Sequence, residues 1–170
     1  MAAYWDRAMD PTPSWTAPVR GELFMHVAAV IKRKGSHVVS IAPDRTIAEA
    51  VSLLTENNIG AVLVLDSTGD TRGILSERDI VNGLAEHGAD ALTQRVEALM
   101  TRDVQHCSPH DTIAEVMKVM TEQRTRHLTV MENGKLVGLI SIGDVVKQRL
   151  IDANLEVETL RGYVSLRADP

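Results

Sequence analysis

The chain has 170 residues, of which 44% are hydrophobic and 24% are charged, and its formal net charge is −5. This length suits one sizeable core or two small repeats that share a core. The acidic balance argues against a binder of duplex nucleic acid, which usually carries a basic stripe. A single cysteine, Cys107, rules out an intramolecular disulfide, and the longest apolar run, IGAVLVL, is far shorter than the roughly 20 residues of a membrane span. We therefore expect a soluble, cytoplasmic protein.

The first 24 residues are expected to be an N-terminal extension. Charges and prolines stand where a signal peptide needs an apolar stretch. Trp5 and Trp15 lie among three prolines, and the sequence leaves open whether they pack on the core, on a partner subunit or on nothing. The positive run Lys32–Lys34 follows, for which a solvated face is the expected role of Arg33.

A pattern of strand, proline and helix then occurs twice. The strands are expected at His37–Ile41 and Asp103–Cys107, and each is followed by a proline and the letters TIAE. Thr followed three residues later by Glu is a capping box, so helices should begin at Thr46 and Thr112. Apolar residues continue at helical spacing after each start.

A β-hairpin and a second helix complete each copy. GAVLVL and RGIL form the first hairpin; RHLTVM and LVGLI form the second, with an Asn-Gly turn at 133–134. The last helix should reach about Gly88 in the first copy and run from Ser141 to about Tyr163 in the second. Each unit is therefore β-α-β-β-α, and the fold class is α+β. The expected division is an extension (1–24), repeat 1 (25–88), a connector (89–99), repeat 2 (100–150) and a C-terminal helix with a tail (151–170).

The hairpins end in two related nine-residue segments, GILSERDIV and GLISIGDVV, which both contain Ser-x-x-Asp. One interpretation is structural, because Ser-x-x-Asp at a strand-to-helix junction is itself a capping box. The other is functional, because a carboxylate in the first helical turn can accept both hydroxyls of a ribose. The two interpretations do not exclude each other.

The ordered series of segments, found twice, resembles the cystathionine-β-synthase (CBS) domain family. The residues that carry the resemblance are VVSIAPDRTIAEAVSLLTENNIGAVLVLD…GILSERDIV in the first copy and VQHCSPHDTIAEVMKVMTEQRTRHLTVMENGKLVGLISIGDVV in the second. Two tandem copies form a Bateman module. The resemblance implies two repeats packed sheet to sheet with pseudo-two-fold symmetry. It also implies ligands that contain adenosine (AMP, ADP, ATP, NAD(H) or S-adenosylmethionine) in clefts between the repeats, a homodimer, and no enzymatic activity. The expected function is a regulatory module that senses energy or redox state for an unknown regulated protein, with AMP as the first candidate ligand.

The family's ribose aspartate falls on Asp79 and Asp144, and its nearby hydroxyl on Ser76 and Ser141. The resemblance pairs Asp144 with the segment from Ile41 to Thr46, and Asp79 with the segment from Cys107 to Thr112, whose helix starts suit phosphates. Family phosphate ligands at the start of the next strand fall on Arg126 and His127. The first repeat has Gly60 and Ala61 there, so only Arg78 could compensate, and a monophosphate should prefer Asp144. Lys34, just before the first strand, is a further candidate phosphate contact.

The homodimer is also expected from the residues, because the apolar sides of the helices should be partly uncovered; the residues concerned are Ile80, Val81, Leu84, Val145 and Val146. Two other functions stay open. The first is a structural dimerisation module with empty clefts. The second is an enzyme or metal site built on His106, Cys107 and His110. Pro109 interrupts that cluster, and the spacing matches no common zinc pattern, so neither metal nor catalysis is expected there.

Overall fold

The computed structural model describes residues 26–166; beyond residue 154 it describes a side chain only at Val157. The N-terminal extension with its two tryptophans thus lies outside the described residues. The chain forms two compact units. Residues 37–104 make up the first, whereas the second combines residues 26–36 with 105–166. No helix in the described part of the chain is long and apolar enough to cross a bilayer.

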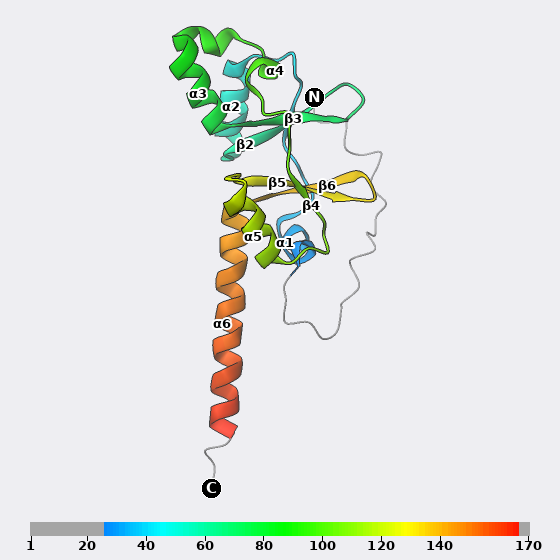
Figure 1. The fold of residues 1–170 in the computed structure, drawn as a ribbon, viewed down its shortest axis with the longest axis vertical. Coiled ribbons are helices and arrows are strands. Elements are labelled where there is room, and N and C mark those ends of the chain that lie inside the picture. The colour runs from blue at the N-terminus through cyan, green and yellow to red at the C-terminus, as the bar shows by residue number, and fades with distance from the viewer. Residues whose placement is uncertain (1–25, 167–170) are drawn as a thin grey trace. The chain divides into compact units, whose positions relative to one another are not determined.

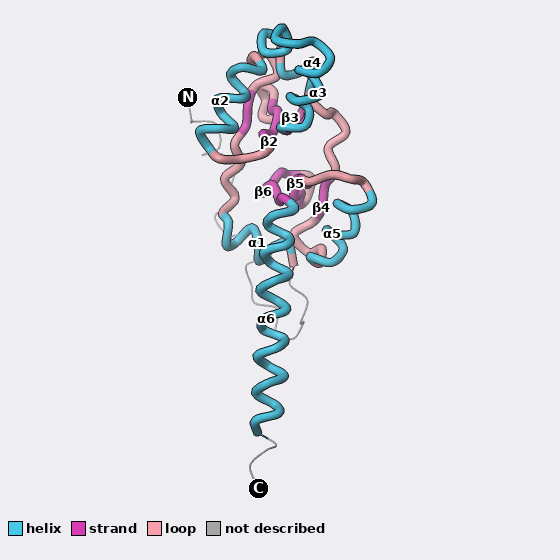
Figure 2. Tube along the Cα trace, turned by 90° about the vertical axis from the view of Figure 1, so that its left-hand side faces the viewer, coloured by secondary structure: helices cyan, strands magenta, loops and turns pink. Residues whose placement is uncertain are grey.

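The first unit is built on a three-stranded mixed sheet of order β1-β2-β3. β1 pairs in parallel with β2, which pairs antiparallel with β3. Helices lie on one side of this sheet in both views (Figures 1 and 2). In chain order the elements are β1 (Ser40–Ile41), α2 (Ile47–Asn57), β2 (Ala61–Leu65), β3 (Thr71–Ser76), α3 (Glu77–His87), the 3₁₀ helix η2 (Gly88–Thr93) and α4 (Val96–Leu99).

The second unit repeats the plan with a sheet of order β4-β5-β6 and a much longer last helix. In Figure 2 its helices also lie on one side of the sheet. Its elements are α1 (Val27–Lys34), β4 (His106–Cys107), α5 (Ile113–Glu122), β5 (His127–Glu132), β6 (Lys135–Ser141) and α6 (Ile142–Leu166). The prediction of an α+β fold with two β-α-β-β-α repeats and a C-terminal helix is confirmed.

Local chemistry explains most element boundaries. Thr46 and Thr112 are the N-caps of α2 and α5, each in a complete capping box with a glutamate. Asn133 and Gly134 have φ values of 51° and 76°, as a tight hairpin turn between β5 and β6 requires. The first strands are shorter than expected: of His37–Ile41 and Asp103–Cys107, only the last two residues of each are strand.

Each unit also includes helical residues that the expected division placed outside the corresponding repeat. The predicted connector, 89–99, forms η2 and α4, which pack within the first unit. Helix α1 was grouped with repeat 1, but it packs on β6 and α6 of the second unit. The two helices dock alike: Val96 of α4 donates to the Arg45 carbonyl at 2.8 Å, and Val27 of α1 donates to the Asp111 carbonyl at 2.9 Å. Each repeat is therefore completed by the helix that precedes the other repeat in the sequence.

Two glycines permit this docking. A Cβ on Gly73 of β3 would lie 2.7 Å from the Thr101 carbonyl oxygen, and one on Gly138 of β6 would lie 2.7 Å from Ile31 Cδ1. The first neighbour is backbone and cannot swing aside, whereas the second is the end of an aliphatic side chain. Gly73 and Gly138, the first residues of the segments GILSERDIV and GLISIGDVV, therefore have a packing role.

We predict that Gly73→Ala lowers the free energy of unfolding by about 1–3 kcal/mol, the usual range for overpacking. Gly138→Ala should cost less, because Ile31 can change rotamer. Gly143→Ala is the control, since its Cβ would lie 3.7 Å from Ser141 Oγ, an ordinary contact. Urea denaturation measures all three variants, and a loss at Gly138 equal to or larger than that at Gly73 would contradict the packing argument.

Candidate functional site

The Ser-x-x-Asp of the second unit lies at the junction of β6 and α6. Ser141 is the last residue of β6, and Asp144 is in the first turn of α6. Asp144 Oδ2 accepts hydrogen bonds from the Ser141 backbone N–H at 2.9 Å and from Ser141 Oγ at 2.7 Å. Ser141 Oγ accepts in turn from the Asp144 N–H at 3.2 Å. The motif forms a reciprocal capping box, so the structural interpretation is correct for this copy.

The first unit has the same junction between β3 and α3. Asp79 Oδ2 accepts from the Ser76 N–H at 2.8 Å and from Ser76 Oγ at 2.6 Å, and Ser76 caps the Asp79 N–H at 3.4 Å. In both units the capping box uses only Oδ2 of the aspartate. The other oxygen, Oδ1, is the one left for further chemistry.

The surroundings of the two aspartates differ. Asp79 Oδ1 accepts a long hydrogen bond of 3.3 Å from Thr101 Oγ1. Asp144 Oδ1 accepts no hydrogen bond from the described residues, but Oδ2 has an added partner, Lys34 Nζ, at 2.8 Å. Lys34, a predicted phosphate contact, thus forms an ion pair with a predicted ribose acceptor.

The ion pair affects the charge of Asp144. Burial alone would raise the pKa of its carboxyl, but the hydrogen bonds from Lys34 and Ser141 outweigh burial and hold the pKa below its ordinary value of 3.8. Asp144 is therefore ionised at neutral pH. An ionised carboxylate accepts hydrogen bonds only, which is what two ribose hydroxyls require of a partner.

The start of β5 brings two further predicted residues to this junction. His127 is the register partner of Ser141, and the Arg126 carbonyl accepts from the Ile142 N–H at 2.9 Å. Arg126 is exposed, and its guanidinium has no polar partner among the side chains that the structure describes. Strand pairing in the second unit thus places Arg126 and His127 beside Ser141, at the junction where Asp144 stands. The ion pair with Asp144 adds Lys34 to the same junction.

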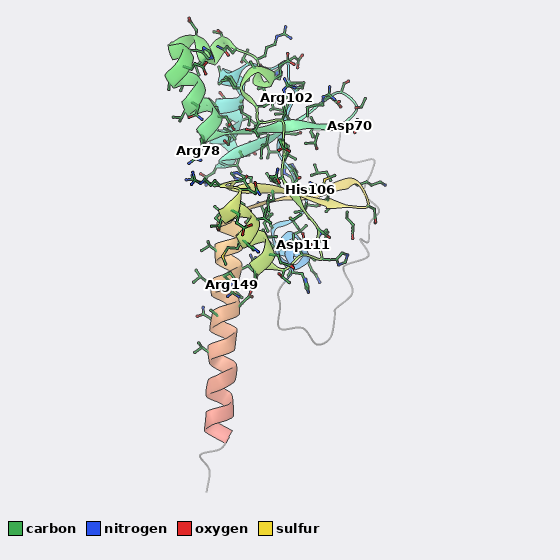
Figure 3. The ribbon with its side chains drawn as sticks, viewed as in Figure 1. Asp70, Arg78, Arg102, His106, Asp111 and Arg149 are labelled. Atoms are coloured by element: carbon green, nitrogen blue, oxygen red, sulfur yellow. The ribbon has the colours of Figure 1, made fainter. Side chains whose placement is uncertain are left out.

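The corresponding positions in the first unit carry no charge. Ala61 pairs with Ser76, and the Gly60 carbonyl accepts from the Glu77 N–H at 3.0 Å. Gly60 and Ala61 therefore occupy the places of Arg126 and His127, as the repeat alignment predicts. Arg78 projects from the first turn of α3 and is exposed (Figure 3). It is the one arginine within this first turn.

The predicted phosphate residues at the starts of α2 and α5 are already engaged in capping. Thr46 Oγ1 accepts from the Glu49 N–H at 3.3 Å while Glu49 accepts from the Thr46 N–H at 2.8 Å, and Thr112 pairs with Glu115 in the same way. The hydrogen bonds from the threonine backbone are the main reason that the pKa values of both glutamates lie below their ordinary value. The Ile41 side chain is in the core of the first unit, so only its main chain could meet a ligand.

Sequence reasoning missed a chain of hydrogen bonds from the basic C-terminal end of α1 to α6. Arg33 is exposed, as expected, but it also donates to Gln148 Oε1 at 2.6 Å, and Gln148 Nε2 donates to Asp152 Oδ1 at 2.8 Å. Gln148 is only 1% exposed. Asp144, Gln148 and Asp152 recur every four residues, a spacing that indicates one face of a helix and that could have been noticed in the sequence.

Cys107 does not have the character of a nucleophile. It is buried, and burial together with the nearby Asp111 raises the pKa of its thiol to about 12. His106, labelled in Figure 3, and His110 are both exposed, and the side chains that the structure describes include no group of three or more His, Cys, Asp or Glu that could hold a metal ion. His106 and Cys107 form β4 and His110 lies in the turn after it, the strand end and loop that the repeat predicts.

The helical faces are partly uncovered, although at fewer positions than expected. Val81 is 62% exposed and Val146 is 48% exposed, whereas Ile80 and Val145 belong to the buried cores, which corrects the prediction for those two. Leu84 is also exposed. An open groove between α2 and α3 adjoins this surface, and Val51, Leu54, Ile59 and Val81 help to line it.

Two α+β units that repeat one sequence pattern, each with a capped aspartate at the same strand-to-helix junction, define a tandem-repeat module. The model of the CBS domain matches residues 27–86 and 96–150, so the chain belongs to the CBS domain family and carries two copies. The crystal structure of the CBS-domain containing protein ATU1752 from Agrobacterium tumefaciens is 44% identical, with a TM-score of 0.74. The match covers 78% of this chain and 98% of that one.

Two further relatives show the range of the family. CBSX3, a mitochondrial CBS domain-containing protein of Arabidopsis thaliana, is 28% identical over 81% of this chain and 71% of its own length. The CBS domain pair of protein MJ0100, solved in complex with 5′-methylthioadenosine and S-adenosyl-L-methionine, is 21% identical and has a TM-score of 0.66 over 77% of this chain and 98% of that one. At this identity the second likeness is one of fold. Because nearly all of ATU1752 is matched, that relative is a stand-alone pair without a catalytic domain.

Proposed function

We propose that the chain is a regulatory module that binds an adenosine nucleotide through Asp144 and Asp79 and passes occupancy on to a regulated protein. The observation that carries the proposal is the Asp144 carboxylate. It is ionised, fixed by its capping box through Oδ2, and accepts no hydrogen bond on Oδ1 from the described residues. Such a carboxylate suits the two adjacent hydroxyls of a ribose.

Adenosine as the nucleoside is supported by the fold relative that was solved with two adenosine derivatives. AMP is our first candidate, because Arg126 offers a positive charge and His127 a hydrogen-bonding ring in the strand beside Asp144, while Gly60 and Ala61 offer neither beside Asp79. NAD(H), ATP and ADP remain members of the same ligand class. The module would then report energy or redox state.

A second function, a structural dimerisation module without a ligand, is favoured by one observation. The capping boxes by themselves give Ser76, Asp79, Ser141 and Asp144 a structural role. Melting curves with and without AMP separate the two functions, since a ligand that binds the native state raises the melting temperature. No shift at millimolar AMP, ADP, ATP or NAD(H) would favour the structural function.

Asp144→Asn tests the ribose contact. An amide keeps one acceptor for the cap but loses the charge and one acceptor oxygen, so we expect AMP affinity to fall at least about tenfold, in line with about 1.5–3 kcal/mol for a charged hydrogen bond. Calorimetric titration measures this. Asp90→Ala, an exposed aspartate in η2, should leave affinity unchanged. Wild-type affinity in Asp144→Asn would remove that residue from the site.

Arg126→Ala tests the phosphate end. Adenosine has no phosphate to lose, so the variant should weaken AMP binding more than adenosine binding. Arg149→Ala removes the same charge from an exposed position on α6, visible in Figure 3, and serves as control. Equal losses for adenosine and AMP in Arg126→Ala would mean that Arg126 maintains the shape of the protein rather than the phosphate contact.

We also propose that the chain is a homodimer in solution through its exposed helical residues. Light scattering at micromolar concentration should give the mass of two chains, and Val81→Glu should reduce it toward that of one chain, because a charge would be buried in an apolar contact. Ser67→Glu, in the exposed β2–β3 turn, is the control. A one-chain mass for the wild type would refute the dimer.

A further inference from the structure

The last residue of α1 occupies the carboxylate on which the proposed function depends. Lys34 Nζ donates to Asp144 Oδ2 at 2.8 Å and to the Leu139 carbonyl at 3.3 Å. The side chain of Lys34 is 40% exposed and that of Asp144 is 21% exposed. The ion pair is thus neither fully solvated nor buried, and the ammonium is held by two acceptors from β6 and α6.

The first unit has a neutral counterpart of this arrangement. Thr101 donates its N–H to the Ile74 carbonyl at 2.9 Å and its hydroxyl to Asp79 Oδ1 at 3.3 Å. Ile74 precedes Asp79 by the same number of residues as Leu139 precedes Asp144. The Lys34 ammonium therefore contacts the same pair of equivalent acceptor groups that Thr101 contacts, but with a positive charge and on the other carboxylate oxygen.

That choice of oxygen limits what Asp144 can still accept. Oδ2 already receives three donors, from Ser141 N–H, Ser141 Oγ and Lys34 Nζ. A carboxylate offers about four acceptor positions over its two oxygens, so Oδ2 is fully used. One ribose hydroxyl can bind to Oδ1 directly. The adjacent hydroxyl can reach Oδ2 only if one of the three donors leaves.

Lys34 is the donor most able to leave. The Ser141 N–H is fixed by the backbone at the start of α6, and the Ser141 hydroxyl closes the capping box. The lysine ammonium is on a flexible four-carbon stem, and water can solvate it once it moves. Its departure removes one contact between α1 and the second unit, while the Arg33–Gln148 hydrogen bond remains.

We infer that Lys34 is an internal competitor for the diol-binding carboxylate Asp144, which a ribose ligand displaces on binding. The inference rests on the proposed function, because it names the residue that sets affinity at the same site. Lys34 lowers the affinity for a neutral nucleoside and links occupancy of Asp144 to the end of α1. For AMP the effect is smaller, because the displaced ammonium can pair with the phosphate.

The test uses calorimetry with adenosine and AMP on the full chain. Lys34→Met removes the charge while keeping much of the stem, and adenosine affinity should rise about two- to fivefold, the range expected for breaking a partly exposed ion pair. The gain for AMP should be smaller. Lys32→Met is the matched control: it makes the same charge change on the same helix, at an exposed residue without a polar partner among those described, and should change neither affinity.

Salt gives a readout that a purely structural role of Lys34 would not produce. Adenosine is uncharged, so about 1 M salt, where the Debye length is about 3 Å, should weaken the Lys34–Asp144 pair and tighten adenosine binding to the wild type. Lys34→Met should show no such gain. If Lys34→Met does not unfold in a single cooperative transition, Lys34→Gln replaces it, with the same expected direction.

The outcomes separate the inference from the proposed function. Adenosine binding by the wild type with unchanged or weaker binding by Lys34→Met overturns the competition and leaves the nucleotide site standing. Adenosine binding by Lys34→Met but not by the wild type supports the competition in its strongest form, in which Lys34 prevents adenosine from binding. Absence of adenosine and AMP binding in the wild type and in both Lys34 variants overturns the proposed function and the inference together.

Discussion

The structure depends on one local interaction, the capping of a helix start by an aspartate three residues after a serine. At the end of β3 and of β6 the chain must turn from a hairpin into a helix, and the first N–H groups of a helix have no partners within it. Oδ2 of Asp79 and of Asp144 accepts from the serine at the junction, and the serine hydroxyl accepts in return. The interaction fixes both carboxylates at the same place in two units, and it does not use Oδ1 in either.

On this shared frame the two repeats have diverged in charge. The second unit gathers Arg126, His127 and Lys34 around its aspartate, whereas the first offers Gly60, Ala61 and the hydroxyl of Thr101. A carboxylate beside a cation has a lower pKa and a stronger local field, but it also has fewer acceptor positions to give. In the proposed site, Arg126 would attract a phosphate, whereas Lys34 would have to leave Oδ2 of Asp144 to admit the second hydroxyl of a ribose.

Helix α1 connects this chemistry to the architecture. It belongs to the second unit although it precedes the first repeat in the sequence, and α4 shows the reverse exchange. Gly73 and Gly138 allow the close approach of the exchanged segments. The last turn of α1 contacts one face of α6: Lys34 pairs with Asp144, and Arg33 donates to Gln148, which in turn donates to Asp152. Lys34 thereby connects Asp144 directly to a helix that precedes the first unit in the sequence.

The sequence by itself determined the repeats, the capping boxes, the hairpin turn at Asn133-Gly134 and the equivalence of Gly60–Ala61 with Arg126–His127, because each of these is a matter of spacing within a few residues. It also determined which aspartates lie at the junctions. Only the tertiary structure decided that β1 and β4 shorten to two residues, that Ile80 and Val145 are buried while Val81 and Val146 are not, and that the exposed Arg33 and Lys34 bond to Gln148 and Asp144 of α6. The physical reason is the exchange of helices: Lys34 is separated from Asp144 by more than a hundred residues, and no local pattern can show which of two similar sheets a helix will cover.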